Sequence, residues 1–440
     1  MAAEYVIVGS GVAGIAAAEA LRARAPGASI TVITEDPNGF YSRPGLAYYL
    51  GGAIPEKQLF PRSHAELRAL GLRWVQAQAT KIDVAGHRVN LADGRSLAYD
   101  KLLIATGARA AAPDFPGGDL DGVFTLDTLA DAKRLIHKAN KSGHAVVVGG
   151  GITALELAEG LHACGVNVHY LLRGARYWSN VLDAEESQLV EDHLRDDGIE
   201  IHYHARIHQA EGKKGRLIAV QTDSGERIPC QILAVAIGTR PNLDLARTAG
   251  VKIDRGILTD SCLRTSAPDI LAAGDVAQVH DDITGRASLD TLWPTARAHG
   301  VAAAATMTGA PTPYRRTAAM NVTLLADIPT TIIGALGSGS DEDMVAIARG
   351  DSESWRAAAP TWVVVEHHEV NRVRIMLGDR TITGALVMGD QTLSRPLHRL
   401  IAAEADISPI RDALLADDHA VLQLIASFSA EWERSHADNS

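Results

Sequence analysis

"EYVIVGSGVAGIAAAEALR", from Glu4 to Arg22, determines the fold expected for the first part of the chain. A short β-branched run is typical of a buried strand, a Gly-x-Gly-x-x-Gly turn follows it, and an alanine-rich helix comes next. "SITVITED", from Ser29 to Asp36, then has the pattern of a second strand, and the acid Glu35 stands at its end. This order of elements predicts a Rossmann-type unit that binds a dinucleotide.

The glycines of this turn have separate expected tasks. Gly9 permits the tight turn, Gly11 lets a pyrophosphate approach the backbone, and Gly14 lets the helix pack closely on the strand. The pyrophosphate then lies at the helix N-terminus, and the final acid accepts hydrogen bonds from ribose hydroxyls. The residues predicted for this first dinucleotide site are Gly9, Gly11, Val12, Ala13, Gly14 and Glu35.

A second stretch, "HAVVVGGGITALELAEGLHACGVNVHYLL" from His144 to Leu172, repeats the pattern. Ala154 takes the third glycine position of its turn, a substitution that the dinucleotide fingerprint allows. Leu172 stands where an acid would bind the ribose 2′-hydroxyl, and Arg173 and Arg176 follow it. These arginines either accept a 2′-phosphate or are solvated loop charges, so NADH and NADPH both remain open.

Two dinucleotide sites of unequal quality in one chain predict one tightly held cofactor and one exchangeable coenzyme. A flavin dinucleotide and a nicotinamide dinucleotide fit this pairing, because hydride passes between those two groups. The pairing requires support from the rest of the chain, which other motifs supply.

Composition narrows the class of protein further. A length of 440 residues, of which 46% are apolar, is typical of a soluble protein of several domains. The net charge of −11 makes nucleic acid or an anionic membrane an unfavourable main partner, because both bind basic surfaces. No apolar stretch is long enough to span a bilayer, and no signal peptide precedes the first strand. We therefore expect a cytoplasmic protein.

Three further stretches occur in the order of a known superfamily. "YDKLLIATGARA" (Tyr99–Ala110) resembles its ATG motif, and "ILAVAIGTRPN" (Ile232–Asn242) is similar to the glycine motif that ends its nicotinamide domain. "TSAPDILAAGDVAQV" (Thr265–Val279) resembles its second flavin motif, whose aspartate binds the ribitol chain. The protein thus resembles the FAD-dependent pyridine nucleotide-disulfide oxidoreductases. Among them it is most similar to rubredoxin reductases, ferredoxin reductases and the flavin module of NAD(P)H nitrite reductases.

The resemblance implies contacts for both cofactors, FAD and either NADH or NADPH. It places Ala79 at the adenine, Asp275 at the ribitol chain and Trp293 at the pyrimidine end of the flavin. The FAD residues predicted beyond the first turn are Arg43, Pro44, Ala79, Ala105, Thr106, Gly107, Gly274, Asp275 and Trp293. Those predicted for the nicotinamide dinucleotide are Gly149, Gly151, Ile152, Thr153, Ala154, Arg173 and Gly238.

The same order of motifs predicts an α/β fold with two Rossmann-like domains. The FAD domain is expected to be discontinuous, in segments 1–112 and 244–311, with the NAD(P)H domain, 113–243, inserted between them. Residues 312–440 are predicted to form a C-terminal α+β interface domain. In it, "RVRIMLGDRTITGALVMGD" has the pattern of two strands around a Gly-Asp turn.

The branches of the superfamily differ in what lies beside the flavin. Where related oxidases carry a redox cysteine, this chain has Arg43, and Cys164, Cys230 and Cys262 are far apart in sequence. We therefore expect electrons to leave the flavin without a thiol relay. Tyr41–Pro44 resembles a signature of the ferredoxin and rubredoxin reductases. Arg43 is thus predicted to bind the flavin diphosphate or stabilise charge on the reduced ring, the alternative being a surface arginine before a proline turn.

One departure from that branch concerns its lysine near flavin N5, because Tyr48 stands there instead. Glu156 matches the glutamate that pairs with this lysine, and we predict that it helps to position the nicotinamide. Without the lysine, its carboxyl is neutral, pairs with Arg43 or belongs to a plain helix residue. Burial without a cation would raise its pKa. Glu156 and Arg43 are the two predicted catalytic residues.

The predicted function is that of an FAD-dependent NAD(P)H:acceptor oxidoreductase that reduces a separate redox protein or enzyme module. The alternatives are an NAD(P)H oxidase or small-molecule reductase, and an NAD(P)H-sensing flavoprotein. The sequence does not identify the electron-acceptor protein, and it is compatible with a monomer or a homodimer.

Histidines cluster in "IHYHARIH". His202 and His204 are two residues apart, which predicts a shared strand face, and His208 lies beyond them. They are interpreted as surface strand residues, because no cysteine or carboxylate partner is recognised beside them. No metal site is predicted.

Overall fold

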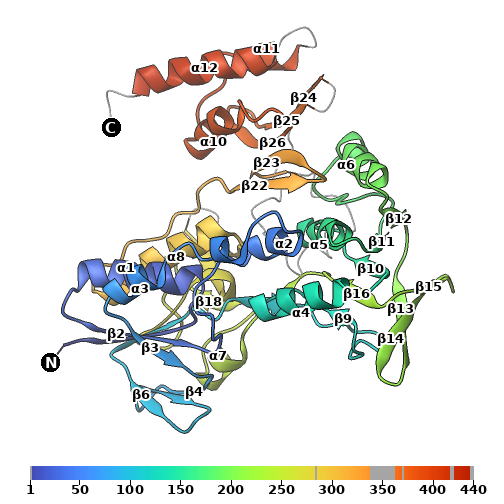
Figure 1. Ribbon diagram of the computed structural model, residues 1–440. Coiled ribbons are helices and arrows are strands. Elements are labelled where there is room, and N and C mark those ends of the chain that lie inside the picture. Colours follow the sequence, from blue (N-terminus) through green and yellow to red (C-terminus); the bar gives the residue numbers. More distant parts are fainter. Residues whose placement is uncertain (1, 283–284, 337–361, 369–370, 417–420, 437–440) are drawn as a thin grey trace.

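The computed structural model describes residues 2–282, 285–336, 362–368, 371–416 and 421–436. The molecule has three parts (Figure 1). Two are parallel sheets with their helices, here called the first and second units. The third is a C-terminal unit that carries the last helices. The predicted fold class is therefore confirmed. The domain boundaries at residues 112, 243 and 311 stay predictions.

The first unit is built on a five-stranded parallel sheet in the order β19-β7-β1-β2-β3. Apart from the edge strand β3, its strands are apolar and almost fully buried, as expected for a parallel sheet covered on both faces. β19 comes from a late segment yet pairs with β7, so the chain leaves this sheet and later returns to complete it. The strands are β1 (Glu4–Val8), β2 (Ser29–Thr34), β3 (Arg73–Gln76), β7 (Lys101–Ile104) and β19 (Ile270–Ala272).

Small residues bring three distant segments together at the first glycine turn. Helix α1 (Val12–Arg24) packs along α8 (Trp293–Met307), and the two lie side by side in Figure 1. A Cβ on Gly300 of α8 would lie only 2.2 Å from the backbone oxygen of Ala13. A Cβ on Gly274 would lie 2.9 Å from the Cβ of Ala13. This close packing places the start of α8 beside the N-terminus of α1.

The second unit repeats the arrangement with the parallel strand order β12-β11-β10-β16-β9. Its helices pack on one face of the sheet, and a three-stranded antiparallel sheet covers the other. The parallel strands are β9 (Val123–Phe124), β10 (His144–Val148), β11 (Asn167–Leu171), β12 (Glu200–His202) and β16 (Ile232–Val235). The helices are α4 (Leu129–Ala139), α5 (Ile152–Ala163) and α6 (Ala184–Asp196), and the covering strands are β13 (Ile207–Lys213), β14 (Arg216–Thr222) and β15 (Arg227–Pro229).

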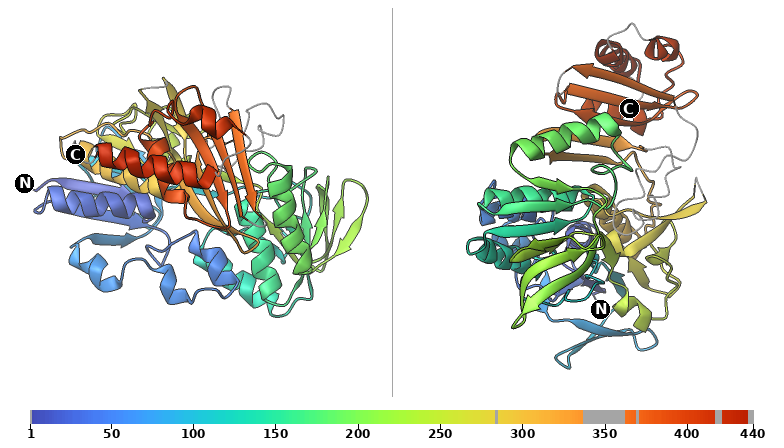
Figure 2. Two further views of the ribbon diagram at one scale, coloured as in Figure 1. Left: turned by 90° about the horizontal axis from the view of Figure 1, so that it is seen from above. Right: turned by 90° about the vertical axis from the view of Figure 1, so that its right-hand side faces the viewer.

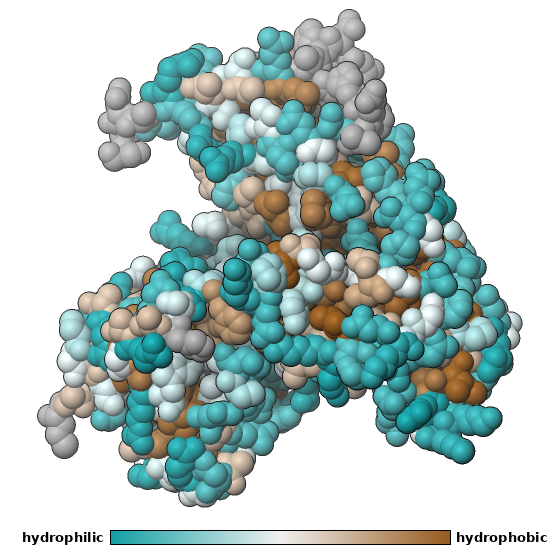
Figure 3. All heavy atoms as spheres, viewed as in Figure 1, coloured by the Kyte–Doolittle hydropathy of each residue, from teal (hydrophilic) through white to brown (hydrophobic). Residues whose placement is uncertain are grey.

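The C-terminal unit is an antiparallel sheet in the order β22-β23-β26-β25-β24. One face packs on the second unit and the other is covered by helices, which lie on the far side of this sheet from the other units (Figure 2, right). Seen as spheres, the molecule is notched between these helices and the first unit (Figure 3). The elements are β22 (Met320–Leu325), β23 (Ile328–Gly334), β24 (Trp362–His368), β25 (Asn371–Leu377), β26 (Ile382–Met388), α10 (Ser394–Ala402), α11 (Arg411–Leu415) and α12 (Val421–His436).

Buried ion pairs tie the C-terminal unit to the second unit. Arg374 of β25 donates to Glu186 of α6 at 2.8 Å, and Arg372 donates to Asp183 at 2.6 Å. Burial alone would raise the pKa of Asp183, but the Glu186 amide and Arg372 outweigh it and hold that pKa below its usual range. The pairing therefore fixes α6 against the C-terminal sheet.

The remaining elements connect these units. Strands β8 (Ala108–Ala110) and β17 (Thr239–Pro241) pair where the chain crosses between the first two units. The others are β4 (Ala79–Asp83), β5 (Arg88–Leu91), β6 (Ser96–Ala98), β18 (Ile257–Thr259), β20 (Ala277–Asp281), β21 (Arg286–Leu289), α2 (Gly45–Leu50), α3 (His64–Ala69), α7 (Asp244–Thr248), and the 3-10 turns η1 (Glu56–Leu59) and η2 (Gly274–Val276). Among the described residues, none of the helices is long and apolar enough to cross a membrane.

Candidate active site

One cavity of about 1520 Å³ is lined by residues of all three units. Its wall includes both glycine turns, the loop before α2, the start of α8 and part of β22. Of the residues predicted for the site, all line this cavity except Gly14 and Ala154. These two occupy the third position of their glycine motifs, where the expected task is packing between helix and strand.

The first glycine turn is held by backbone contacts that exclude a side chain. Gly9 has φ +115°, and a Cβ there would lie 2.1 Å from the carbonyl oxygen of Ala105. A Cβ on Gly14 would lie 2.0 Å from the Gly9 oxygen. Around Gly11, by contrast, a Cβ would have no neighbour within 4 Å. The turn thus leaves open space beside the N-terminus of α1, where the backbone N–H groups have no side-chain cap.

The other residues predicted for FAD come from the ends of several strands. Glu35 follows β2, Ala79 opens β4 and Ala105–Gly107 follow β7. Gly274 and Asp275 form η2 at the other side of the cavity. Burial raises the pKa of Asp275 to about 6, although the nearby charge of Arg43 lowers it. A carboxyl that lines a cavity in this way can accept hydrogen bonds from ligand hydroxyls.

The Arg43 loop is held in place by three hydrogen bonds. Arg43 Nη1 donates to the carbonyl oxygen of Ala108 at 3.2 Å. The buried hydroxyl of Tyr41, two residues earlier, donates to Asp36 at 2.7 Å and accepts from the Leu129 amide at 3.1 Å. These contacts hold the Arg43 guanidinium at the cavity wall. Arg43 is exposed and lines the cavity, and its contact with the flavin stays a prediction beside the alternative of a surface arginine.

Trp293 lies at the start of α8, where it lines the cavity. Its ring stacks on Phe40, with centroids 5.9 Å apart and an interplanar angle of 26°. The indole is therefore both part of an aromatic pair and part of the cavity wall, and its contact with the flavin stays a prediction.

The second glycine turn reproduces the backbone contacts of the first. Gly149 has φ +149°, and a Cβ there would lie 2.2 Å from the Ala236 oxygen. Ala154 is fully buried, and its methyl group takes the close packing position that Gly14 occupies in the first unit. Gly150 leaves open space, and Ile152 and Thr153 line the cavity next to it.

Strand register shows which residue of the second site corresponds to Glu35. The strand before each glycine turn ends opposite a residue of the next strand: Val8 opposite Ile33, and Val148 opposite Leu171. In both units the first glycine amide donates to the carbonyl oxygen of that partner. Glu35 is the second residue after the partner in the first unit, so the same count identifies its counterpart in the second.

That counterpart is Arg173, and the prediction that Leu172 takes the place of the acid is wrong by one position. Leu172 is 1% exposed and packs in the core of the second unit. Arg173 is exposed and lines the cavity, as do Arg176 and Arg206. Arg176 donates to the Ser179 carbonyl at 3.0 Å, while its Nε is buried without a hydrogen-bond partner. Sequence reasoning missed Arg206, because it follows a different strand and no dinucleotide-binding motif includes it.

Glu156 lies in the second turn of α5 and lines the cavity that both glycine turns share. Burial and the neighbouring Glu159 raise its pKa to about 8. Tyr48, from α2, lines the same part of the cavity, and burial and the charge of Glu156 raise the pKa of Tyr48 too. The sequence left open whether the Glu156 carboxyl is neutral or pairs with Arg43. The structure favours a neutral carboxyl at neutral pH, because the charge of Arg43 lowers the pKa of Asp275 and not that of Glu156. Thr323 of β22, which hydrogen-bonds Tyr48, was not anticipated.

Comparison with known proteins agrees with this geometry. Residues 3–300 match the pyridine nucleotide-disulphide oxidoreductase family. The chain belongs to this family. It is an FAD-dependent NAD(P)H oxidoreductase, with FAD and NAD(H) as its cofactors.

Relatives of this oxidoreductase include two named reductases. It is 31% identical over 361 residues to the biphenyl dioxygenase system ferredoxin–NAD(+) reductase component of Paraburkholderia xenovorans, covering 79% of this chain and 84% of that protein. It is 30% identical over 353 residues to the rubredoxin-NAD(+) reductase of Pseudomonas putida, covering 78% and 89%. A ferredoxin reductase structure from Rhodopseudomonas palustris superposes with a TM-score of 0.82 at 26% identity, covering 92% of this chain and 96% of that one.

The residues that line the cavity of the oxidoreductase fit both cofactors. Each glycine turn combines an obligatory glycine with open space for a diphosphate at a helix N-terminus. Glu35 and Asp275 supply carboxyl acceptors for hydroxyl groups on the side predicted for FAD. Among the described residues that line the cavity, none is a cysteine. Cys230 is completely buried in the core of the second unit, and Cys164 contacts the Leu50 carbonyl at 3.5 Å.

Proposed function

We propose that this oxidoreductase takes hydride from NAD(P)H onto FAD and passes the electrons directly to a separate electron-transfer protein. The observation that carries the proposal is the single cavity, which joins both glycine turns and has no cysteine among its described lining residues. Bound FAD supplies the chemistry that links a two-electron donor to a one-electron acceptor. Without a thiol beside it, that chemistry needs no disulfide intermediate.

The chain's own groups would hold the permanent cofactor through many contacts. The α1 N-terminus and the open space at Gly11 receive the diphosphate, Glu35 the ribose and Asp275 the ribitol chain. Arg43, fixed by the Ala108 carbonyl, adds a positive charge near Asp275. We assign to Arg43 the stabilisation of negative charge in this part of the site.

Glu156 would act through the proton that it keeps at neutral pH. A protonated carboxyl offers a hydrogen-bond donor and adds no negative charge between the two dinucleotide sites. An ionised carboxylate there would oppose the arrival of hydride. Tyr48, in the place of the lysine found in similar reductases, supplies no cation, so the neutrality of Glu156 rests mainly on burial, with a smaller contribution from the charge of Glu159.

The positive charge at the second site bears on the choice of coenzyme. Arg173 occupies the position of the ribose-binding acid, and Arg176 and Arg206 line the same cavity. Arginine binds phosphate through charge-assisted, often bidentate hydrogen bonds. We therefore propose that the enzyme accepts NADPH as well as NADH.

The relatives support the class of acceptor. Two curated relatives are named as reductases of ferredoxin and rubredoxin, both one-electron carriers. We propose an acceptor of this class, a small iron protein that docks at the rim of the cavity.

The test is an anaerobic titration of the purified yellow protein with NADH and, separately, NADPH. Bleaching of the flavin band by either coenzyme is expected, followed by reoxidation on adding a rubredoxin or a [2Fe-2S] ferredoxin. No bleaching with either coenzyme would overturn the hydride path. Equally fast reoxidation by oxygen alone would favour an oxidase, and a reduced protein that persists with every acceptor would favour a sensor.

A further inference from the structure

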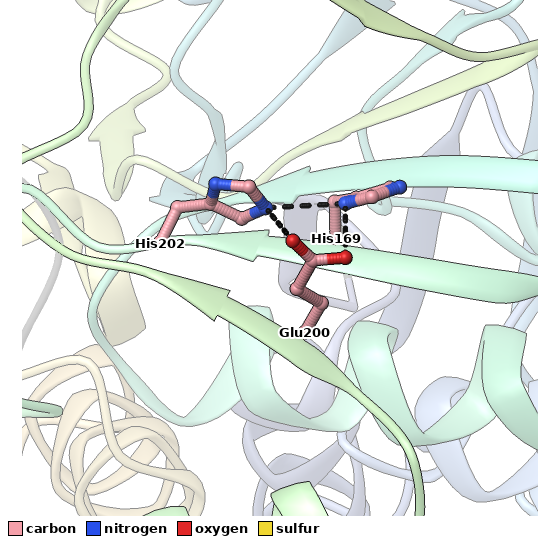
Figure 4. Close-up of side chains that lie close together, drawn as sticks. All are labelled: His169, Glu200 and His202. Atoms are coloured by element: carbon pink, nitrogen blue, oxygen red, sulfur yellow. Dashed lines mark hydrogen bonds and ion pairs between the residues drawn. The ribbon is translucent and has the colours of Figure 1, made fainter.

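Away from the coenzyme cavity, three metal-ligating side chains meet on the second sheet (Figure 4). His169 lies on β11, and Glu200 and His202 lie on β12, the edge strand of the sheet. His169 pairs in register with Glu200, and residues two apart on a strand share a face. The strand pairing alone therefore brings all three side chains to one side of the sheet.

The spacing of their ligand atoms matches a tetrahedral site. His169 Nδ1 lies 3.1 Å from His202 Nε2 and 3.3 Å from a carboxylate oxygen of Glu200. His202 Nε2 lies 3.4 Å from the other oxygen of that carboxylate. Ligands about 2.0–2.1 Å from a tetrahedral zinc ion are about 3.3–3.4 Å from one another. We propose that His169, Glu200 and His202 bind a divalent transition-metal ion, with zinc the reference case.

The surroundings suit such an ion. The ring nitrogen of His202 that faces away from the trio, Nδ1, lies 3.6 Å from a carboxylate oxygen of Glu226. A carboxylate behind a ligating histidine orients the ring and raises its basicity. The His144 ring stacks on His169, with centroids 6.4 Å apart. The side chains of His202 and His169 are only 13% and 21% exposed, whereas Glu200 is 64% exposed. Water can therefore reach a fourth coordination position.

The histidine pair expected from the sequence is not the pair that forms. β12 ends at His202, and His204 has φ +51° in the turn that follows, with an exposed side chain. The prediction that His202 and His204 share a strand face is therefore wrong. Glu200, two residues before His202, was not recognised as a partner, and His169 belongs to a strand 33 residues earlier.

An ion at this site would stabilise the short edge strand β12 of the second sheet. β12 has only three residues, and the carbonyl oxygen of its last residue, His202, accepts a hydrogen bond from the Leu172 amide at 2.8 Å. Ala205, whose amide donates to the Leu172 carbonyl oxygen at 2.9 Å, lines the coenzyme cavity. Metal binding would thus stabilise the wall at the Arg173 end of that cavity, with no part in hydride transfer.

The experiment titrates zinc chloride into the EDTA-treated, buffer-exchanged flavoprotein by calorimetry and follows thermal unfolding in parallel. One equivalent is expected to bind and to raise the unfolding temperature. His202→Asn should weaken binding by at least about 100-fold, and Glu226→Gln by about tenfold. His204→Asn is the matched control, because asparagine tolerates the left-handed conformation of that position, and its zinc affinity should equal that of the wild type.

The flavin absorbance spectrum of each variant reports whether the chain still folds. If the wild type binds no zinc, or if His202→Asn, with its flavin spectrum intact, binds zinc as tightly as the wild type, the proposal is overturned. The trio would then be a hydrogen-bonded surface cluster.

Discussion

The two glycine turns make similar backbone contacts, but the residues that follow the neighbouring strand in each unit carry opposite charges. In each turn, the first glycine has a positive φ. A Cβ on Gly9 would lie 2.1 Å from the Ala105 oxygen, and a Cβ on Gly149 would lie 2.2 Å from the Ala236 oxygen. Two residues after the paired strand position, however, the first unit presents Glu35 and the second an arginine.

The comparison separates two levels of specificity. Close packing of backbone on backbone decides that a dinucleotide binds at all, because only glycine fits there. We expect the exposed side chain at the end of the second strand to decide which dinucleotide is preferred, because the residue at this position of the dinucleotide fold binds the ribose. Substitution of the closely packed glycines should therefore abolish binding, whereas substitution of the exposed side chain should change only the preference.

The largest effect is expected for Gly9→Ala. A Cβ at φ +115° and 2.1 Å from a carbonyl oxygen forces the turn to shift, at a cost of about 3 kcal/mol or more. The variant should purify without FAD or fail to fold, as measured by flavin content and thermal unfolding. Gly11→Ala is the control: it meets no atom within 4 Å, so folding should survive while FAD binds more weakly.

Gly149→Ala should break the second site alone. The variant should keep its FAD, while flavin reduction by either coenzyme slows by about 100-fold, because the strained turn no longer holds the diphosphate. Stopped-flow absorbance measures this rate. Gly150→Ala, which has open space, should lower only the affinity for coenzyme. Loss of FAD from Gly149→Ala would show that the two sites are not independent.

Arg173→Glu should convert the second site toward the chemistry of the first. Losing a charge-assisted contact worth about 1.5–3 kcal/mol should raise the KM for NADPH by about 10–100-fold and leave that for NADH little changed. Steady-state kinetics with both coenzymes measure the ratio. Arg176→Gln provides a comparison at a more buried position. An unchanged ratio in Arg173→Glu would contradict the register argument.

Glu156→Gln should have the smallest effect at neutral pH and a clear one above it. Because the pKa of Glu156 is about 8, the wild-type carboxyl is protonated at neutral pH and ionises as pH rises further. Flavin reduction in the wild type should therefore slow several-fold between about pH 7 and pH 9, whereas the variant stays level. Stopped-flow rates across this range test it, and parallel pH profiles would refute it.

The same group makes a prediction for stability. The raised pKa of folded Glu156 means that folding takes up a proton between the ordinary pKa of 4.5 and about 8. Stability contributed by this group is fully present below about pH 4.5 and is lost as pH rises through about 8. Glu156→Gln should remove this dependence, so the variant gains thermal stability over wild type as pH rises.

Local sequence was sufficient for much of this protein. Strand, glycine turn and helix are contiguous, and their geometry follows from steric rules on neighbouring residues, so both Rossmann units and most of the cavity-lining glycines were predictable. The return of the chain at β19 was also predicted, through the motif around Asp275.

What depended on contacts between distant strands was decided only in three dimensions. The alignment of Arg173 with Glu35, rather than of Leu172, follows from strand register, since a shift of one residue turns a side chain from cavity to core. The neutrality of Glu156 depends on burial that no local pattern encodes. The trio of His169, Glu200 and His202 exists only because two strands from different parts of the chain lie in register.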